Sequence, residues 1–283
     1  MRGGRHFLGS VLIAFGVVSA LVQFVGQLFP NAFSDPGFVT TVTLMFCLAY
    51  GIVRSWPKRR VRRTFMLPEM SVSIVPGDLF DEPGHLVVGF SDTFDTCVAG
   101  GVPVNGDSVQ GQLLRRRYGG DVELLDEDLE AGLRRTRPLA TEERTDKPVG
   151  KLDRYPIGTV AVLGERPRLV FAVAYSRFGN DCVAESGVEE LWFSLNRLWD
   201  AVYRHGQHEG VAMPLIGDGL SRVDFLDPES LLRLVLLSFV TRSRERRICR
   251  ELRIVLRPEV FRRIDLREAE AFLNSLGSGP SRS

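Results

Sequence analysis

The fold is decided by residues 211–222, which read Val211-Ala212-Met213-Pro214-Leu215-Ile216-Gly217-Asp218-Gly219-Leu220-Ser221-Arg222. An apolar run ends at Ile216, a loop with two glycines follows, and Asp227-Pro228 indicates the start of a helix. A buried strand, a glycine loop and a helix in this order favour phosphate binding, because glycine lets the backbone approach an anion and successive N–H groups point at it. Ordinary strand-to-helix connections show the same pattern, so the prediction needs support from other loops.

Apolar strands and helices alternate on both sides of this stretch. The predicted strands are 72–75, 85–90, 157–163, 169–174 and 252–256, and the predicted helices are 108–118, 127–135 and 266–276, with two more beginning at Ser186 and Asp227. Ser186 and Glu189 are spaced as a capping box. The alternation predicts an α/β sandwich with a mostly parallel or mixed sheet.

Polar loops follow several of these strands. Asp78, the run Ser91 to Thr96, Ser108 and the loop 217–222 all fall at strand ends or helix starts. Ligands of such sheets bind at the carboxyl ends of the strands, so these loops are expected to converge. Asp92 and Asp95 either bond a ligand or cap a turn.

Other chemistries find little support in the sequence. His205 and His208 are three residues apart with no third ligand nearby, which favours a surface helix end over a metal site. There is no P-loop lysine motif and no nucleophile elbow. We therefore predict no catalytic residue, no metal site and no resident cofactor.

The chain has 283 residues with a net charge of +1, so bulk nucleic-acid binding is not indicated.

The amino-terminal part has the composition of a membrane hairpin. Apolar runs without charge, from Phe7 to Phe29 and from Phe38 to Val53, predict two transmembrane helices at about 7–29 and 38–56. A cleaved signal peptide is disfavoured because the first run is too long and a second follows at once.

The basic residues between Arg54 and Arg63 set the predicted topology. Under the positive-inside rule they place both ends of the hairpin, and everything after it, in the cytoplasm of an inner-membrane protein. Residues 57–69 are expected as a basic linker, 70–277 as the ligand-sensing domain and 278–283 as a tail. The four cysteines form no CxxC pair and are expected to be reduced.

The first predicted span carries a stripe of small and amide side chains, namely Gly9, Gly16, Ser19, Gln23, Gly26 and Gln27. Small residues allow close helix packing in lipid, and glutamines can hydrogen-bond across it. The stripe packs either against the second span or against other copies of the chain.

Taken together, the soluble part resembles a macro domain, with a three-layer sandwich and a mixed sheet. Asp78 after a glycine is similar to the family's adenine-binding aspartate, Ser108-Val109-Gln110-Gly111 to its first phosphate loop and residues 214–220 to its second. The loop after the second strand lacks the asparagines of hydrolytic members, so the resemblance does not imply catalysis. The candidate ligand-binding residues are Asp78, Leu79, Ser91, Asp92, Thr93, Phe94, Asp95, Ser108, Val109, Gln110, Leu215, Gly217, Asp218, Gly219, Leu220, Ser221 and Arg222.

Two spans before such a domain resemble the membrane effectors of type II Thoeris anti-phage systems. The resemblance implies that an ADP-ribose-derived signal, histidine-ADP-ribose made from NAD by a partner TIR-domain enzyme, binds the macro domain. Binding would drive homo-oligomerisation, disruption of membrane lipid and abortive infection. The alternatives are a membrane-anchored ADP-ribosyl hydrolase or ADP-ribose reader, and an anchored scaffold that binds no ligand. Release of product from an ADP-ribosylated substrate would distinguish the hydrolase from a signal receptor.

Overall fold

The protein was analysed as a computed structural model, which describes residues 60–98, 104–180, 183–218 and 226–277, together with Ala20, Thr41, Thr43 and Met45. The chain divides into two compact units, Met1–Lys58 and Arg59–Ser283. The predicted spans at 7–29 and 38–56 lie almost wholly outside the described residues. Among the residues that are described, no helix has the length and apolar character needed to cross a membrane.

The second unit is built on one sheet of eight strands. The strands in chain order are β1 (Val61–Met66), β2 (Glu69–Pro76), β3 (His85–Ser91), β6 (Val160–Leu163), β7 (Val170–Phe178), β8 (Ala184–Glu185), β9 (Val211–Pro214) and β10 (Glu251–Leu256), and β4 (Ala140–Thr141) and β5 (Asp153–Arg154) form a separate two-stranded ribbon. The order across the sheet is β1-β2-β10-β9-β3-β7-β6, with β8 paired to β7. Strands β2, β10, β9, β3 and β7 are mutually parallel, while β1, β6 and β8 are antiparallel to their neighbours. The predicted mixed sheet is confirmed.

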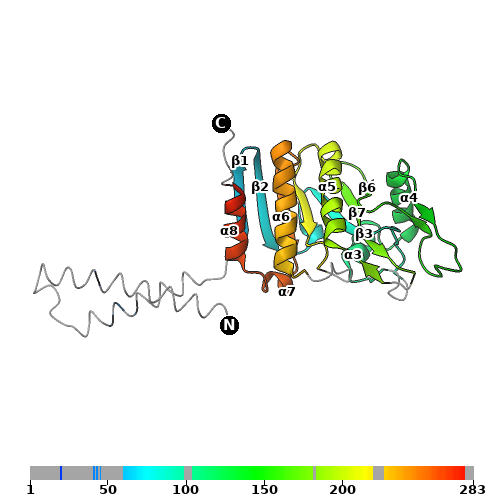
Figure 1. Cartoon of the computed structure of the whole chain (residues 1–283), viewed down its shortest axis with the longest axis horizontal. Coiled ribbons are helices and arrows are strands. Elements are labelled where there is room, and N and C mark those ends of the chain that lie inside the picture. Colours follow the sequence, from blue (N-terminus) through cyan, green and yellow to red (C-terminus); the bar gives the residue numbers. More distant parts are fainter. Residues whose placement is uncertain are drawn as a thin grey trace, which may run out of the picture. The chain divides into compact units, whose positions relative to one another are not determined.

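Helices cover the two faces of the sheet unequally. The helical elements are η1 (Leu79–Asp81), α3 (Val109–Arg117), α4 (Val122–Leu133), α5 (Val188–His205), α6 (Pro228–Glu245), α7 (Pro258–Phe261) and α8 (Leu266–Gly277). Helices α5, α6 and α8 lie side by side on one face (Figure 1). They help to form the larger core cluster, in which the rings of Trp199 and Phe239 meet edge to face. Helices α3 and α4 pack on the other face beside β3 and β6 and enclose a second cluster.

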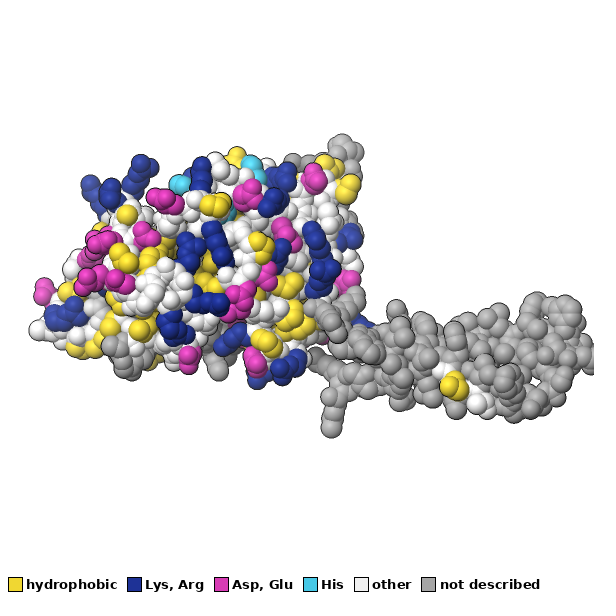
Figure 2. Space-filling model, turned by 180° about the vertical axis from the view of Figure 1, so that it is seen from behind, with side chains coloured by type: hydrophobic (Ala, Val, Ile, Leu, Met, Phe, Trp, Pro, Cys, Tyr) yellow, Lys and Arg dark blue, Asp and Glu magenta, His cyan; other side chains and the backbone are white. Residues whose placement is uncertain are grey.

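The face of the sheet that carries α3 and α4 is polar in the part that lies outside the second core cluster. The side chains of β1, β2 and β10 alternate between the two faces, as strand geometry requires. Val61, Val72 and Ile254 enter the larger core, whereas Arg62 and Arg253 alternate with such residues and belong to neither core cluster. Basic and acidic side chains are interspersed over the face seen from behind (Figure 2).

Several predicted boundaries are corrected by the structure. The sheet begins inside the expected linker 57–69, because β1 buries Val61 and Phe65 against the core. The other residues of β1 are exposed, and they mask the strand pattern in the sequence. The predicted strand 157–163 begins only at Val160, since Gly158 has φ +85° and breaks the extended run. The helix predicted at 127–135 is α4, which begins earlier because Asp121 caps it.

The predicted capping box of α5 lies one residue further along the chain. The carboxylate of Glu190 accepts from the Gly187 N–H, 3.1 Å away. The Ser186 hydroxyl donates instead to the Tyr175 carbonyl at 2.7 Å and is buried, so it joins the segment before α5 to β7. The helix starts predicted at Ser108 and Asp227 are confirmed, and both side chains cap their helices by accepting from Gly111 N–H and Ser230 N–H.

Candidate functional site

The candidate site lies at the carboxyl edge of the five parallel strands. The loops after β2, β3 and β9 all start at this edge, because parallel strands end on the same side of a sheet. Backbone hydrogen bonds join the ends of neighbouring strands at this site. Gly77 N–H donates to the Leu256 carbonyl at 3.0 Å, and Asp92 N–H donates to the Ser176 carbonyl at 2.8 Å. The predicted convergence of the polar loops is therefore a property of the sheet topology.

Asp78 is the first polar side chain after β2. One carboxylate oxygen accepts from the Phe80 N–H at 2.9 Å and thereby caps η1. The other oxygen pairs at 2.5 Å with the guanidinium of Arg116, which also reaches Asp81 at 2.9 Å. The Asp78 side chain remains 37% exposed, so its carboxylate is accessible to a ligand. Leu79 is buried in the core, and only its backbone is available at the edge.

Ser108 opens α3 at the same edge. Its hydroxyl accepts from Gly111 N–H at 3.1 Å and donates to the Asn105 carbonyl at 2.6 Å. Val109 and Gln110 form the first turn, where backbone N–H groups lack partners within the helix. A Cβ on Gly111 would lie 2.3 Å from the Gly106 carbonyl oxygen, so glycine is needed for the loop to fold back on the helix. The predicted first phosphate loop thus has the backbone arrangement of an anion-binding helix start.

The loop after β9 begins in the core and ends beyond the described residues. Leu215 is buried, Gly217 has φ +91°, and the Asp218 carboxylate lies 3.9 Å from the Arg257 guanidinium. The left-handed backbone at Gly217 is a conformation that favours glycine. Gly219, Leu220, Ser221 and Arg222, the rest of the predicted second phosphate loop, lie outside the described residues.

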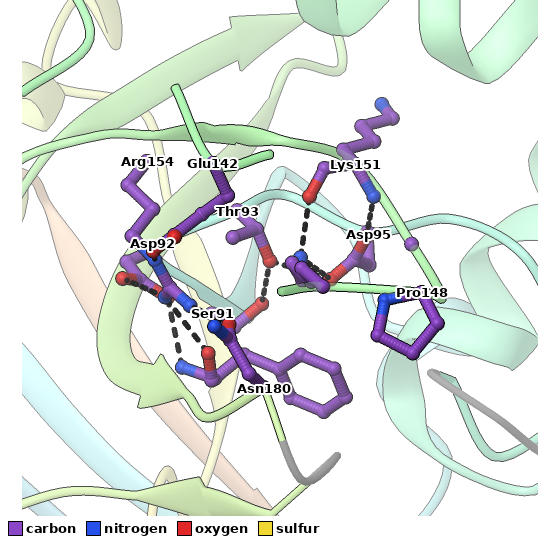
Figure 3. Close-up of polar contacts among 12 residues, drawn as sticks. Ser91, Asp92, Thr93, Asp95, Glu142, Pro148, Lys151, Arg154 and Asn180 are labelled. Carbon is purple, nitrogen blue, oxygen red and sulfur yellow. Dashed lines mark hydrogen bonds and ion pairs between the residues drawn. The ribbon is translucent and has the colours of Figure 1, made fainter. Parts of the chain in front are cut away.

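The loop after β3 is arranged differently from the sequence prediction. Asp92 is buried and accepts from Phe178 N–H at 2.8 Å and from Arg154 Nη1 at 2.9 Å (Figure 3). Arg154 also donates to the Phe178 carbonyl and to Asn180 Oδ1, each at 2.8 Å, and contacts Glu142. Arg154 therefore joins Asp92 to the ends of β7 and of the polar segment 139–155. The hydrogen bond between Glu142 and Arg154 holds the pKa of the Glu142 carboxyl below its usual value.

Asp95 holds the same segment at a second point. Its carboxylate accepts from Thr93 Oγ1 and from Lys151 N–H, each at 2.5 Å, and lies 3.4 Å from Lys147 Nζ. The Lys147 side chain is 1% exposed and stacks over the Phe178 ring at 5.4 Å. Burial lowers the pKa of Lys147, while the neighbouring Asp95 carboxylate acts in the opposite direction. The segment 139–155, which we call the strap, is thus fastened by two buried acidic residues.

Phe94 is the turning point of this loop. Its backbone has φ +48°, an uncommon conformation for a bulky residue, and its fully buried ring packs against Phe90 and Tyr155 at 5.6 and 5.7 Å. Such a conformation persists where surrounding packing determines it. The side chains of Asp92, Thr93, Phe94 and Asp95, all candidate ligand-binding residues, are buried and face the protein. Asp92 and Asp95 bond backbone N–H groups, which is closer to the alternative of a structural role that the sequence left open. Of this run, Ser91 is only partly buried, with its hydroxyl 3.2 Å from that of Thr93.

The sequence analysis missed the partners of these acids. Lys147 and Arg154 are 52 and 62 residues from Asp95 and Asp92, and no local pattern connects them. It also missed Ser176, whose buried hydroxyl has no hydrogen-bond partner within the described residues. Ser176 pairs with Ser91 across the parallel strands, so this hydroxyl lies beside the loop after β3. A buried unpaired donor of this kind is normally satisfied by a water or a ligand.

The site offers binding groups more clearly than reactive ones. A general base needs a carboxylate within reach of a water, whereas Asp92 and Asp95 are buried and each is engaged by a cation and a backbone N–H. Across the described ranges, no three His, Cys, Asp or Glu side chains converge to hold a metal ion. The partly exposed features are the Asp78 side chain and the start of α3 at Ser108, whereas Gly217 is buried.

A family model for the macro domain of the Thoeris protein ThsA matches residues 72–257 of this chain. The chain belongs to the ThsA macro domain family. A curated relative, the Thoeris protein ThsA of Bacillus amyloliquefaciens (strain Y2), is 28% identical over 183 residues. The match covers 62% of this chain and 59% of that relative, so the chain spans less than two thirds of its length.

Solved macro domains share the fold of this one. A point mutant of the Oceanobacillus iheyensis macrodomain has a TM-score of 0.52 at 12% identity and covers 77% of this chain and 100% of its own. The same macrodomain with ADP has a TM-score of 0.51 at 13% identity, with the same two shares covered. The predicted macro-domain sandwich is therefore confirmed for the second unit, and the loops at Asp78, Ser108 and Gly217 are loops of a macro domain.

Proposed function

We propose that this protein is an anti-phage effector whose macro domain binds an ADP-ribose-type signal at the carboxyl edge of the sheet. Membership of the ThsA macro domain family supports the defence role, and the macrodomain with ADP is a neighbour in fold. The observation that carries the ligand proposal is the position of Asp78, a partly exposed carboxylate at the end of β2, on the same side of the sheet as the loops at Ser108 and Gly217. A carboxylate accepts hydrogen bonds from an adenine amino group, and the loops supply N–H donors for a diphosphate.

The finer proposal concerns the signal and its consequence. The signal is histidine-ADP-ribose produced from NAD by a partner TIR-domain enzyme. Binding drives oligomerisation of the chain, and the apolar segments 7–29 and 38–56 disrupt the inner membrane, which ends in abortive infection. The basic residues from Arg54 to Arg63 support a cytoplasmic macro domain. A reporter enzyme fused after Ser283 tests this placement: a cytoplasmic reporter is expected, and activity on the outer side of the membrane contradicts it.

Asp78→Asn is the sharpest test of ligand binding. Asparagine can still accept from Phe80 N–H and keep the cap on η1, but its NH2 group replaces the second acceptor oxygen. Losing a hydrogen bond to a charged acceptor costs about 1.5–3 kcal/mol, so affinity for ADP-ribose and for histidine-ADP-ribose should fall by roughly ten- to a hundred-fold. Isothermal titration calorimetry of the full chain measures this.

Asp81→Asn is the matched control. Asp81 pairs with the same arginine as Asp78 and undergoes the same change in charge, but it lies within η1 and is 68% exposed. This variant should bind as the wild type does. Equal affinities for wild type and Asp78→Asn, or equal losses in both variants, would remove Asp78 from the binding site. Release of free ADP-ribose from an ADP-ribosylated protein by the wild type would favour the hydrolase alternative.

A further inference from the structure

A hollow of about 460 Å³ lies at the amino-terminal ends of the parallel strands, on the side of the sheet opposite the candidate site. It is bounded by the β1–β2 hairpin, by the start of β9 at Gly210 and by the residues before and within β10. Its size falls within the roughly 300–1,000 Å³ range of small-molecule sites. Because the loops of the proposed nucleotide site leave the other end of the same strands, the hollow is separate from that site.

Arginines dominate the lining of the hollow. Arg62 comes from β1, Arg247 and Arg250 from the loop after α6, and Arg253 from β10. Two glutamates, Glu69 and Glu251, are the only acidic residues among the lining residues, so the lining carries an excess of positive charge. Four like charges brought around one hollow repel each other, and a bound anion relieves that repulsion.

The acidic neighbours of Arg253 hold it in one orientation. Its guanidinium donates to Glu82 at 3.0 Å and to Glu251 at 2.8 Å, and Glu251 in turn accepts from the Ser73 hydroxyl at 3.1 Å. Arg250 pairs with Glu209 at 2.8 Å on the outer side. These contacts neutralise part of the charge and hold the part-buried Arg253 guanidinium in place.

The other two arginines have no partner of their own. Arg62 and Arg247 are exposed, and the side chain of neither makes a hydrogen bond or ion pair with any residue that the structure describes. Arg62 lies on the face of β1 away from α8, because side chains alternate along a strand and Val61 and Phe65 occupy the core side. A planar guanidinium without an internal partner matches phosphate oxygens bidentately.

We propose that this hollow binds a phosphate-bearing anion, with Arg62 and Arg247 contacting the phosphate and Arg253 forming the fixed wall. The phosphate can belong to a soluble diphosphate compound or to the headgroup of an anionic lipid, since the two present the same oxygens. This second site does not depend on the proposed ADP-ribose site.

The test uses the full chain in a nonionic detergent and two probes. Calorimetry with inorganic pyrophosphate examines the soluble source, and calorimetry with monomeric dihexanoyl phosphatidylglycerol examines the lipid source, with dihexanoyl phosphatidylcholine as the zwitterionic reference. The variant Arg62→Gln/Arg247→Gln removes both unpaired charges. Binding of the preferred probe should weaken about tenfold or more, and wild-type binding should decline as salt is added.

The matched control is Arg134→Gln/Arg137→Gln, which removes two exposed arginines beyond α4. It should bind the probe as the wild type does. Pyrophosphate binding lost only in the Arg62/Arg247 variant assigns a soluble ligand, and phosphatidylglycerol binding lost only there assigns a lipid. No binding of either probe, or equal binding by all three proteins, overturns the proposal. ADP-ribose binding should survive in the Arg62/Arg247 variant, and its loss would contradict two separate sites.

Discussion

Replacing Lys147 by methionine should destabilise the protein far more than the same change at Lys151. Lys147 is 1% exposed and its partner Asp95 3%, so the substitution leaves a carboxylate buried without its counter-charge. Breaking a buried pair costs about 3–5 kcal/mol. Asp95 keeps the Thr93 hydroxyl and the Lys151 N–H as donors, which places the expected loss near the lower end, about 3 kcal/mol. Methionine has similar length and retains the contact with the Phe178 ring.

Lys151 provides the matched comparison. Its Nζ lies 2.6 Å from Asp126, and both side chains are 32% exposed. Partly exposed pairs of this kind contribute about 0–1 kcal/mol, so Lys151→Met should have little effect on the free energy of unfolding. The backbone N–H of Lys151, which donates a hydrogen bond to Asp95, is present in both variants.

Urea denaturation of the two variants and the wild type measures the difference. Amide hydrogen exchange adds a local reading, because the Lys151 N–H should exchange faster once Asp95 is no longer held by Lys147. Equal denaturation midpoints for Lys147→Met and Lys151→Met, with unchanged exchange at Lys151, would refute the view that the buried pair fastens the strap.

Two further predictions follow from the geometry. Burial lowers the pKa of His85, whose Nδ1 accepts from Leu169 N–H. The unfolded chain therefore takes up the proton first, and stability should be full above pH 6.5 and fall as the pH drops from 6.5 through the lowered pKa. Denaturation at pH 7.5 and 5.5 checks this, and His85→Gln should flatten the slope. Gly150→Ala should cost more stability than Gly119→Ala, because both have positive φ but only at Gly150 does the new Cβ come within 2.4 Å of an Asp95 oxygen. Similar thermal midpoints would contradict that reasoning.

The elements of the sandwich could be predicted from sequence because each carries its own pattern. The strand before Gly217 is a continuous apolar run, and Ser108 and Asp227 are cap residues just before their helices. Strand β1 was missed because it shows only two buried apolar residues among arginines. The order of strands across the sheet has no local signal and follows from packing of the complete chain.

The candidate site was predictable in part for the same reason. Asp78, Ser108 and Gly217 could be placed at the ends of their strands and helices because the sequence marks an element boundary beside each of them. Asp92 and Asp95 were placed in the correct loop, but their role depends on Arg154 and Lys147, which a long polar segment brings back to them. Exposure or burial of an acidic side chain depends on such distant partners, and a single sequence does not encode them locally.

The position of β2 in the sheet has a consequence for synthesis of the protein. The Ser73 hydroxyl on β2 and its Glu251 partner on β10 are 178 residues apart in the chain. At about 5–20 residues per second, the ribosome needs roughly 10–40 s to deliver the second strand after the first. During that time β2 has only the β1 hairpin beside it and an open edge of the kind that pairs with other chains. A chain that ends before β10 therefore yields an aggregation-prone fragment, and the sheet is complete only after β10 has been synthesised.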